Sequence, residues 1–274
     1  MDLWGILAWF ALGAAAATFG SVVGLGGGVI LVPGLIAFGE LLTGEEIGTG
    51  TAVGTSLVVL IVTALSSTWA FARRKRVDFR SGLLYAAASV PASAAGAAMT
   101  ETLRPAQFEL AFGVFMLALS GLLFARSHMR PLTRAWPVKR MFADADGRVH
   151  EYGHHPVWAV GIGLGVGFVS GLFGIGGGSL FVPAMVLLFR YPPHVATATS
   201  MFVILLSACS GSLTHITQSN VDWAAAAALA PGAWLGGIWG AWITSRMSGQ
   251  ALLNVLRVTF VLLALRMIAS GLTG

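Results

Sequence analysis

The amino-acid sequence predicts an all-α polytopic membrane protein made of two inverted repeats, each with about five membrane helices or half-helices and a Gly-rich break. The first observation is composition: the 274 residues are 56% hydrophobic and only 10% charged, and the mean hydropathy is +0.82. Ordinary soluble domains do not have this balance. The second is that apolar runs recur from end to end of the chain, and the third is a motif that occurs twice. We therefore expect the chain to have a bilayer as its solvent.

The apolar runs of the first half are predicted to be helices because most approach the roughly 20 residues that a spanning helix needs. They cover residues 4–23, 29–42, 53–72, 83–99 and 108–124. The second run is short, so a tilted span, a re-entrant segment and half of a broken helix all remain open for it.

The second half contains the same series of runs, at residues 157–173, 179–189, 196–216, 224–243 and 252–271. Its second run is again the short one. This agreement in order and length indicates that the two halves are related.

Sequence motifs make the duplication explicit. Gly-Leu-Gly-Gly-Gly at 24–28 is followed by Pro33, and Gly-Ile-Gly-Gly-Gly at 174–178 is followed by Pro183 at the same spacing. Further matches occur in the same order: Ala-Val-Gly-Thr-Ser at 52–56 with Ala-Thr-Ala-Thr-Ser at 196–200, Val-Asp-Phe at 77–79 with Val-Asp-Trp at 221–223, Pro91 with Pro231, and Gly96 with Gly236. We interpret the chain as a duplicated unit.

Basic residues in the loops predict the orientation, because Lys and Arg near helix ends favour the cytoplasmic side. The strongest clusters are Arg-Arg-Lys-Arg at 73–76 and the basic stretch at 126–140. Two spans separate them, so both can be cytoplasmic. If the short runs also cross, each half has five crossings, and this odd number inverts one half relative to the other.

The charges of equivalent loops reverse in sign, as inversion requires. Residues 217–220 carry no charge where the first half has its basic cluster, and Arg190 stands where the first half has Glu40, Glu45 and Glu46. An inverted five-plus-five arrangement is therefore favoured over a parallel four-plus-four one. It divides the chain into an N-terminal membrane repeat (1–125), a cytoplasmic connecting loop (126–156) and a C-terminal membrane repeat (157–274), with the N-terminus outside.

The remaining charges and the cysteine exclude several functions. The net charge of +5 resides mainly in short loops, where it sets orientation, so we expect no nucleic-acid partner. The single Cys209 cannot form an intramolecular disulfide and is predicted to be a small buried apolar residue. Asp78 and Asp222 each precede a helix, which favours N-capping over catalysis. We expect no metal and no cofactor.

The Gly-rich breaks are the predicted functional site. Three glycines in a row favour unwinding of a helix, and unwound backbone in a bilayer is tolerated only inside protein or beside a wet cavity. Matched breaks in two repeats are typical of a transport site between them. The alternative is that these small residues only allow close helix packing.

An anion is the predicted substrate, because half-helices that begin at the breaks direct N–H groups and the positive dipole end into the site. Nearby hydroxyl groups add neutral donors, and no Asp or Glu lies deep in a span. The predicted substrate-binding residues around the breaks are Ser21, Gly24, Gly26, Gly27, Gly28, Thr55, Ser56, Ser170, Gly174, Gly176, Gly177, Gly178, Ser179, Thr199 and Ser200.

Two further residues complete the predicted site. His215 could hydrogen-bond an anion or carry a proton, with a packing role as the alternative. Arg257 lies inside the last apolar run and could attract an anion, although a long basic side chain can also reach the membrane interface.

With these motifs the chain resembles the TauE/SafE family of sulfite and organosulfonate exporters over nearly its whole length. The resemblance rests on Gly-Leu-Gly-Gly-Gly-x4-Pro at 24–33, Gly-Ile-Gly-Gly-Gly-x4-Pro at 174–183 and Ala-Thr-Ala-Thr-Ser at 196–200. It implies a secondary transporter of sulfite, small sulfonates or related sulfur oxyanions in a bacterial inner membrane. The first half departs from the pattern at Gly54, which stands where the second half has Ala198.

Two other functions remain open at this point. An anion channel could use the same unwound glycines. An intramembrane serine hydrolase could use Ser210 or Ser212 with His215, about one helical turn apart. Against the hydrolase, the equivalent segment of the first half has Phe71 in place of the histidine.

Overall fold

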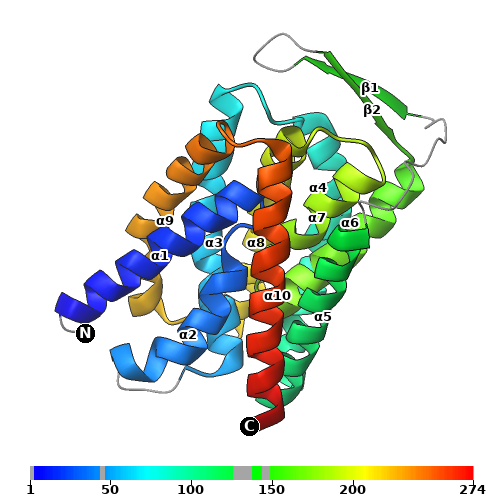
Figure 1. The fold of residues 1–274 in the computed structure, drawn as a ribbon. Coiled ribbons are helices and arrows are strands. Elements are labelled where there is room, and N and C mark those ends of the chain that lie inside the picture. The colour runs from blue at the N-terminus through cyan, green and yellow to red at the C-terminus, as the bar shows by residue number, and fades with distance from the viewer. Residues whose placement is uncertain (1–2, 44–46, 126–137, 144–148, 274) are drawn as a thin grey trace.

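The computed structural model describes residues 3–43, 47–125, 138–143 and 149–273 (Figure 1). Its helices and strands are α1 (Leu3–Val23), α2 (Gly28–Thr43), α3 (Thr49–Arg73), α4 (Phe79–Met99), the 3₁₀ turn η1 (Thr100–Thr102), α5 (Pro105–Ala125), β1 (Val138–Ala143), β2 (Val149–His154), α6 (Pro156–Phe173), α7 (Gly178–Leu187), α8 (Pro193–Thr217), α9 (Trp223–Thr244) and α10 (Gly249–Thr273).

The predicted all-α polytopic class is confirmed. Each predicted apolar run corresponds to one helix of the structure. Five of the described helices, α1, α3, α4 with η1, α6 and α8, are long and apolar enough to cross a membrane. The chain is therefore a multi-pass membrane protein.

The connection between the halves contains an element that the sequence analysis did not predict. Within 126–156, strands β1 and β2 form an antiparallel hairpin in which Val138 pairs with His154 and Ala143 with Val149. The basic residues at 126–134 and the acidic residues Asp144 and Asp146 lie outside the described residues.

Local sequence signals fix several helix starts. Proline is the first residue of α6 and α8, where its missing N–H costs no hydrogen bond. The predicted N-caps are confirmed: Asp78 accepts a hydrogen bond from the Ser81 N–H, and Asp222 accepts from the first N–H groups of α9. These caps define where α4 and α9 begin after their preceding turns.

The two halves interlock through equivalent helices. α1 packs along α9, whereas its counterpart α6 packs along α4, and α3 and α8 pack on each other in the middle. Glycines make these approaches possible, since a Cβ atom on Gly232 would overlap the Phe10 carbonyl oxygen and one on Gly171 would overlap that of Ser93. Glycines outside the breaks thus allow helices to pack closely.

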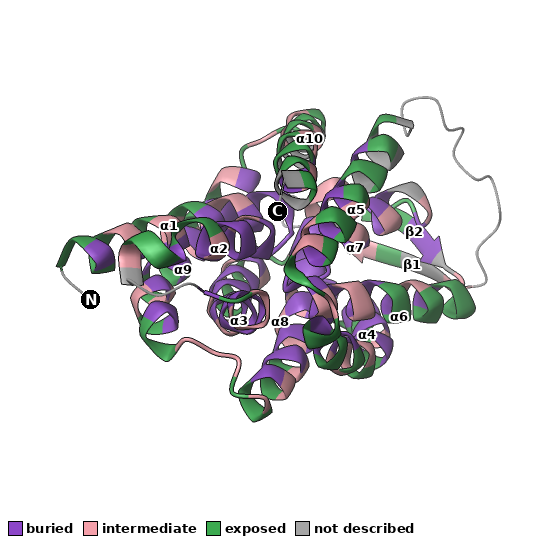
Figure 2. Ribbon diagram, turned by 90° about the horizontal axis from the view of Figure 1, so that it is seen from below, coloured by how far each residue is buried: buried purple, intermediate pink, exposed green. Residues whose placement is uncertain are grey.

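Figure 2 shows many exposed residues along the outer helices, and large apolar side chains are among them. Large exposed side chains include Trp4, Trp69, Trp158, Trp223, Trp239 and Trp242. Such a surface suits contact with lipid. Cys209, predicted to be buried, is exposed on this surface because it lies one turn before the exposed Leu213 on the outer side of α8.

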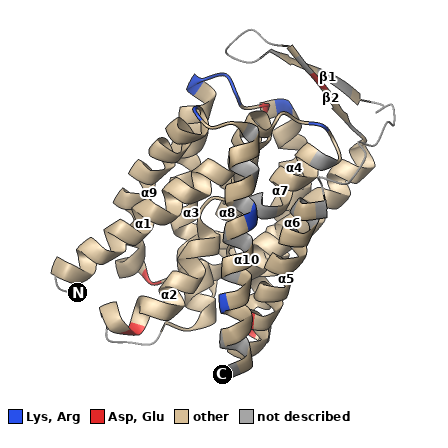
Figure 3. Ribbon diagram, in the orientation of Figure 1, with Lys and Arg blue, Asp and Glu red and all other residues tan. Residues whose placement is uncertain are grey.

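Basic residues gather at the end of the molecule where α3 meets α4, while acidic residues of α2 and α5 lie toward the opposite end (Figure 3). The hairpin also lies at the basic end. Tyr152 of β2 donates a hydrogen bond to Asp78 Oδ2 at 2.8 Å, and its ring packs 4.0 Å from the ring of Tyr191. The hairpin is thereby attached to the starts of α4 and α8.

Candidate functional site

The glycine motifs interrupt the helices at matched positions, as predicted. In the first break, Gly24, Gly26 and Gly27 have φ angles of 79°, 81° and 98°. In the second break, the equivalent residues Gly174, Gly176 and Gly177 have φ angles of 67°, 77° and 69°. L-amino acids rarely adopt these angles, so glycine is needed at all six positions. Gly28 and Gly178 begin α2 and α7, and Ser179 follows as the second residue of α7.

The two breaks meet in the middle of the molecule. A Cβ atom on Gly28 would overlap the carbonyl oxygen of Gly174, and one on Gly176 would lie 3.3 Å from the carbonyl oxygen of Leu25. All residues from Gly24 to Gly28 are buried. The half-helices therefore begin next to each other although they are about 150 residues apart in the chain.

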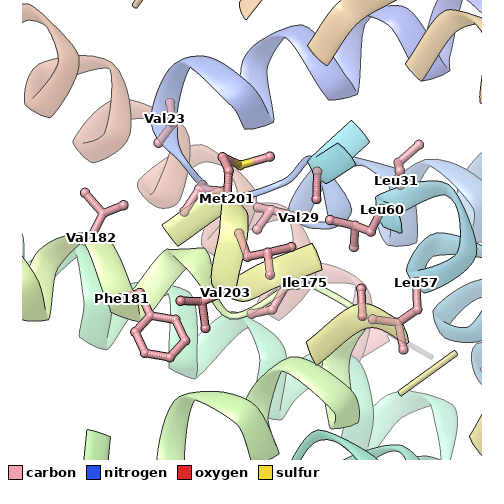
Figure 4. Close-up of a cluster of buried hydrophobic side chains, with 14 of the residues drawn as sticks. Val23, Val29, Leu31, Leu57, Leu60, Ile175, Phe181, Val182, Met201 and Val203 are labelled. Atoms are coloured by element: carbon pink, nitrogen blue, oxygen red, sulfur yellow. The ribbon is translucent and has the colours of Figure 1, made fainter. Parts of the chain in front are cut away.

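Two apolar side chains that the sequence analysis missed pack against both breaks. Leu60 of α3 and Ile204 of α8 are fully buried. A Cβ atom on Gly176 would lie 2.9 Å from Leu60 Cδ2 and 3.0 Å from Ile204 Cγ2, and one on Gly26 would contact the same two side chains. Figure 4 shows Leu60 in the surrounding cluster of buried apolar side chains, together with Ile175. The described residues thus close the centre between the breaks with apolar packing.

The internal repeat of the sequence could have identified Leu60 and Ile204 as equivalent residues. They follow Ser56 and Ser200 by four residues each, so they occupy equivalent places one helical turn along α3 and α8. The polar groups that predict the site do not point to them, because their side chains carry no hydrogen-bond donor or acceptor.

Ser56 and Ser200 link each half to the break of the other half. The Ser56 hydroxyl donates to the Gly174 carbonyl oxygen at 3.0 Å. The Ser200 hydroxyl donates a shared bond to the carbonyl oxygens of Gly24 at 3.0 Å and of Thr197 at 2.8 Å. The carbonyl groups of Gly174 and Gly24 lie at the ends of α6 and α1, where helical hydrogen bonding stops. In an apolar surrounding they need such donors, so both serines stabilise the closed arrangement.

We expect Ser56→Ala and Ser200→Ala each to lower the free energy of unfolding by about 1–3 kcal/mol, because each leaves a buried carbonyl group without its donor. Thermal unfolding of the purified variants measures the effect. Thr217→Ala is the control, since the Thr217 hydroxyl bonds locally to the Thr214 carbonyl oxygen at an exposed end of α8. Equal unfolding temperatures for all three variants would contradict a stabilising role of the cross-links.

Thr55 and Thr199 also link the two halves, but they bond to the turns that precede α9 and α4. The Thr199 hydroxyl oxygen accepts from the Asp78 N–H at 3.0 Å, and the Thr55 hydroxyl oxygen accepts from the Asp222 N–H at 2.9 Å. Each threonine therefore anchors the start of α4 or α9 in the other half. Both hydroxyl oxygens therefore already accept a hydrogen bond from a turn of the other half.

Ser21 and Ser170, two further serines of the predicted site, have unequal surroundings. Ser21 donates to the Gly237 carbonyl oxygen at 2.9 Å and accepts from the Ser67 hydroxyl at 2.8 Å, so it joins α1 to α9 and α3. The buried Ser170 hydroxyl has no hydrogen-bond partner among the described residues, and a Cβ atom on Gly177 would lie 3.5 Å from it. Of the two, Ser170 has the hydroxyl that is available beside a break.

His215 and Arg257 lie away from the glycine breaks. His215 is buried near the end of α8, 11 residues beyond Ile204, which corresponds to about 16 Å along a helix. Arg257 of α10 lies with its guanidinium carbon 5.2 Å from the Phe124 ring centre of α5. Neither residue is among the nearest neighbours of the break glycines in the described structure.

The geometry gives the hydrolase hypothesis no support. Within the described residues, the Ser212 hydroxyl and both imidazole nitrogens of His215 have no hydrogen-bond partner, so they do not bond each other. A nucleophile activated by a histidine would need that bond or a close approach to it.

Comparisons with known proteins agree with the glycine motifs. A family model described as "Sulfite exporter TauE/SafE" matches residues 9–267. The chain is 41% identical over 263 residues to the probable membrane transporter protein YunE of Bacillus subtilis, covering 95% of this chain and 96% of that protein. It is 26% identical to the probable membrane transporter protein YjnA of the same organism, covering 90% and 93%. A probable membrane transporter protein of Methanocaldococcus jannaschii is 27% identical, covering 73% and 68%. No solved structure matches significantly.

Proposed function

Because the chain belongs to the TauE/SafE sulfite exporter family and is a membrane transporter rather than an enzyme, we propose that it exports sulfite or small organosulfonate anions. The proposed mechanism is alternating access between two inverted repeats, with the substrate bound at the glycine breaks. The observation that carries this proposal is that two breaks from equivalent positions of the two halves meet in the middle of the molecule.

Contacts between turns support the inverted arrangement. The α3–α4 turn contacts the α9–α10 turn through a hydrogen bond from Arg74 to the Ser245 hydroxyl. The α8–α9 turn contacts η1, where Asn220 donates to Glu101 Oε1 at 2.5 Å. Since the α3–α4 turn and η1 flank α4 at opposite ends, the equivalent α3–α4 and α8–α9 turns also belong to opposite ends. Two repeats related by inversion require this relation.

The charges support an orientation with the basic end in the cytoplasm and the N-terminus outside, in a bacterial inner membrane. Arg73, Arg74, Arg76 and Arg246 belong to turns of the basic end, and Glu101 belongs to the opposite end. A reporter inserted after Gln218 is expected outside the cell. Its detection in the cytoplasm would overturn the orientation.

The backbone supports an anionic substrate. The first turns of α2 and α7 present N–H groups and the positive ends of their dipoles at the breaks. No carboxylate is among the nearest neighbours of the break glycines in the described part of the chain. Sulfite and sulfonates carry oxygen atoms that several N–H groups can bind at once.

The closed packing supports a carrier over a channel. Leu60 and Ile204 fill the space between the breaks, and the Ser56 and Ser200 hydrogen bonds hold the halves together there. In an alternating-access cycle the substrate would open this contact toward one side at a time. A continuous pore would need the same contact to be open toward both sides.

Flux in proteoliposomes tests the proposal. We expect uptake of sulfite that saturates with concentration and is inhibited by ethanesulfonate, because a carrier turns over one bound substrate at a time. Protein-free liposomes are the control. Flux that rises linearly with sulfite and ignores the sulfonate would favour an anion channel, and no flux of any sulfur oxyanion would overturn transport of this substrate class.

A further inference from the structure

Three polar side chains near the start of α8 carry buried atoms without hydrogen-bond partners among the described residues. These atoms are Arg76 Nη1, His194 Nδ1 and Thr197 Oγ1. Thr197 as a whole is 0% exposed. A buried polar group without a partner costs about 1–3 kcal/mol, so native proteins rarely keep one unless water, an ion or a ligand completes its hydrogen bonding.

The three groups follow one path from the basic end toward the first break. His194 and Thr197 are three residues apart in the first turns of α8 and therefore share a face of the helix. Arg76 belongs to the α3–α4 turn, which contacts the first turns of α8 through the hydrogen bond from the Asp78 N–H to the Thr199 hydroxyl oxygen. A Cβ atom on Gly24 would lie 3.0 Å from Thr197 Cα. The path thus begins at the basic turn and ends beside Gly24.

The same face of α8 continues directly into the proposed site. Ser200 follows Thr197 by three residues, and its hydroxyl donates to the Gly24 carbonyl oxygen. An anion released from Thr197 toward the membrane centre would next meet the residues of the first break. The path is therefore continuous with the site and reaches the apolar contact at Ile204 one turn farther along α8.

The chemistry of the path favours an anion. Arg76 supplies a permanent positive charge, Thr197 a hydroxyl donor and His194 an imidazole that can donate. The N-terminus of the 25-residue helix α8 adds partial positive charge. The carboxylate of Asp78, two residues along the chain from Arg76, is engaged by the Ser81 N–H, the Ser81 hydroxyl and the Tyr152 hydroxyl.

The other half of the chain lacks this set of groups. The repeat matches His194 with Gly50 and Thr197 with Val53, which offer no side-chain donor. The side chains at these equivalent positions are therefore chemically different in the two halves, and the polar set lies at the end that carries the basic turn.

We propose that Arg76, His194 and Thr197 form an anion-binding vestibule that admits small oxyanions to the first glycine break. This proposal rests on the proposed transport of sulfur oxyanions and specifies where the anion first binds. The vestibule favours anions with several oxygen atoms, because its donors come from two different segments of the chain and can bind different oxygen atoms.

Anion binding to the purified full-length protein in detergent tests the vestibule without requiring transport. Sulfite is titrated by calorimetry against the wild type and the isosteric variant Thr197→Val. We expect the affinity to fall by at least about tenfold in the variant, since a hydrogen bond to a charged group contributes about 1.5–3 kcal/mol. The unfolding temperature should stay the same or rise, because the hydroxyl removed has no partner in the protein.

Arg76→Gln is the second variant, and the same fall in affinity is expected of it. Arg74→Gln is its matched control, since Arg74 lies in the same basic turn but bonds Ser245 instead. The control should bind sulfite within about twofold of the wild type. Thr197→Ser, which retains the hydroxyl, should also bind as the wild type does.

The outcomes separate this proposal from the transport proposal. Unchanged affinity in both Thr197→Val and Arg76→Gln, or no binding of sulfite by the wild type, would overturn the vestibule. Binding that is lost in these variants, combined with no flux in wild-type proteoliposomes, would support the vestibule and overturn the transport proposal instead.

Discussion

Gly28→Ala is expected to abolish sulfite flux and to lower the unfolding temperature clearly. The added methyl group would overlap the carbonyl oxygen of Gly174 and come within 2.8 Å of Ile175 Cα. Both obstacles are backbone atoms of the other break, so a change of side-chain rotamer cannot relieve them. Overpacking of this kind costs about 1–3 kcal/mol or more. Proteoliposome flux and thermal unfolding measure the two effects.

Gly165→Ala is the matched control for Gly28→Ala. Gly165 is an exposed glycine in α6, and no atom of the described structure lies within 4 Å of a Cβ atom placed there. Alanine is favoured over glycine by about 1 kcal/mol inside a helix, so stability should hold or rise and flux should persist. If Gly28→Ala matched Gly165→Ala in both measurements, the two breaks would not form the contact described above.

The helices and breaks could be predicted from the sequence because a bilayer leaves the backbone few choices. Apolar runs of spanning length must be helical in hydrocarbon, where every N–H and C=O group needs a partner. Consecutive glycines such as Gly26 and Gly27 then mark the places where the helix stops. The positive φ angles at these positions agree with that prediction.

The roles of the hydroxyl groups could not be predicted in the same way. The sequence shows that Ser56 and Ser200 are donors, but their acceptors are backbone carbonyl groups in the opposite half. Finding these acceptors requires the contact between helices, which hydropathy does not specify. The binding roles predicted for both serines stay predictions, since in the closed arrangement their hydrogen bonds go to Gly174 and Gly24.

His215 lies apart from the breaks in this structure, and its predicted role in the site stays a prediction. His215 shares α8 with Thr199 and Ser200, but 1.5 Å of rise per residue separates it from them by about 22 Å or more. Arg257 lies on a different helix, α10, where it packs against Phe124 of α5. A residue can therefore share a helix with a site, or lie close to it in the sequence, and still be far from it in the fold.

The difference between Gly54 and Ala198 has a structural cause and gives the second large effect. A Cβ atom on Gly54 would overlap the carbonyl oxygen of Asn220 and lie 2.9 Å from His215 Cβ. The α8–α9 turn therefore occupies the space that a methyl group would need. Ala198 of the second half has a fully buried side chain in the equivalent place. The halves differ here because their turns pack differently against α3 and α8.

Gly54→Ala is accordingly expected to displace the α8–α9 turn and to destabilise the protein by about 1–3 kcal/mol or more. The displacement would also weaken the bond from the Asp222 N–H to Thr55 and the bond from Asn220 to Glu101. Thermal unfolding measures the stability, and amide hydrogen exchange of residues 218–222 measures the displaced turn. Faster exchange in this turn than in the α3–α4 turn is the specific signature.

Ala198→Gly provides the reciprocal control, because it makes the second half resemble the first at this position. It removes one buried methyl group and adds helix-interior glycine, which together cost about 1–2 kcal/mol, without forcing any backbone atom to move. The variant should keep sulfite flux and a normal exchange rate at residues 218–222. If Gly54→Ala also kept both, the turn could accommodate a methyl group, and Gly54 would then be a tolerated difference between the halves rather than a requirement of the α8–α9 turn.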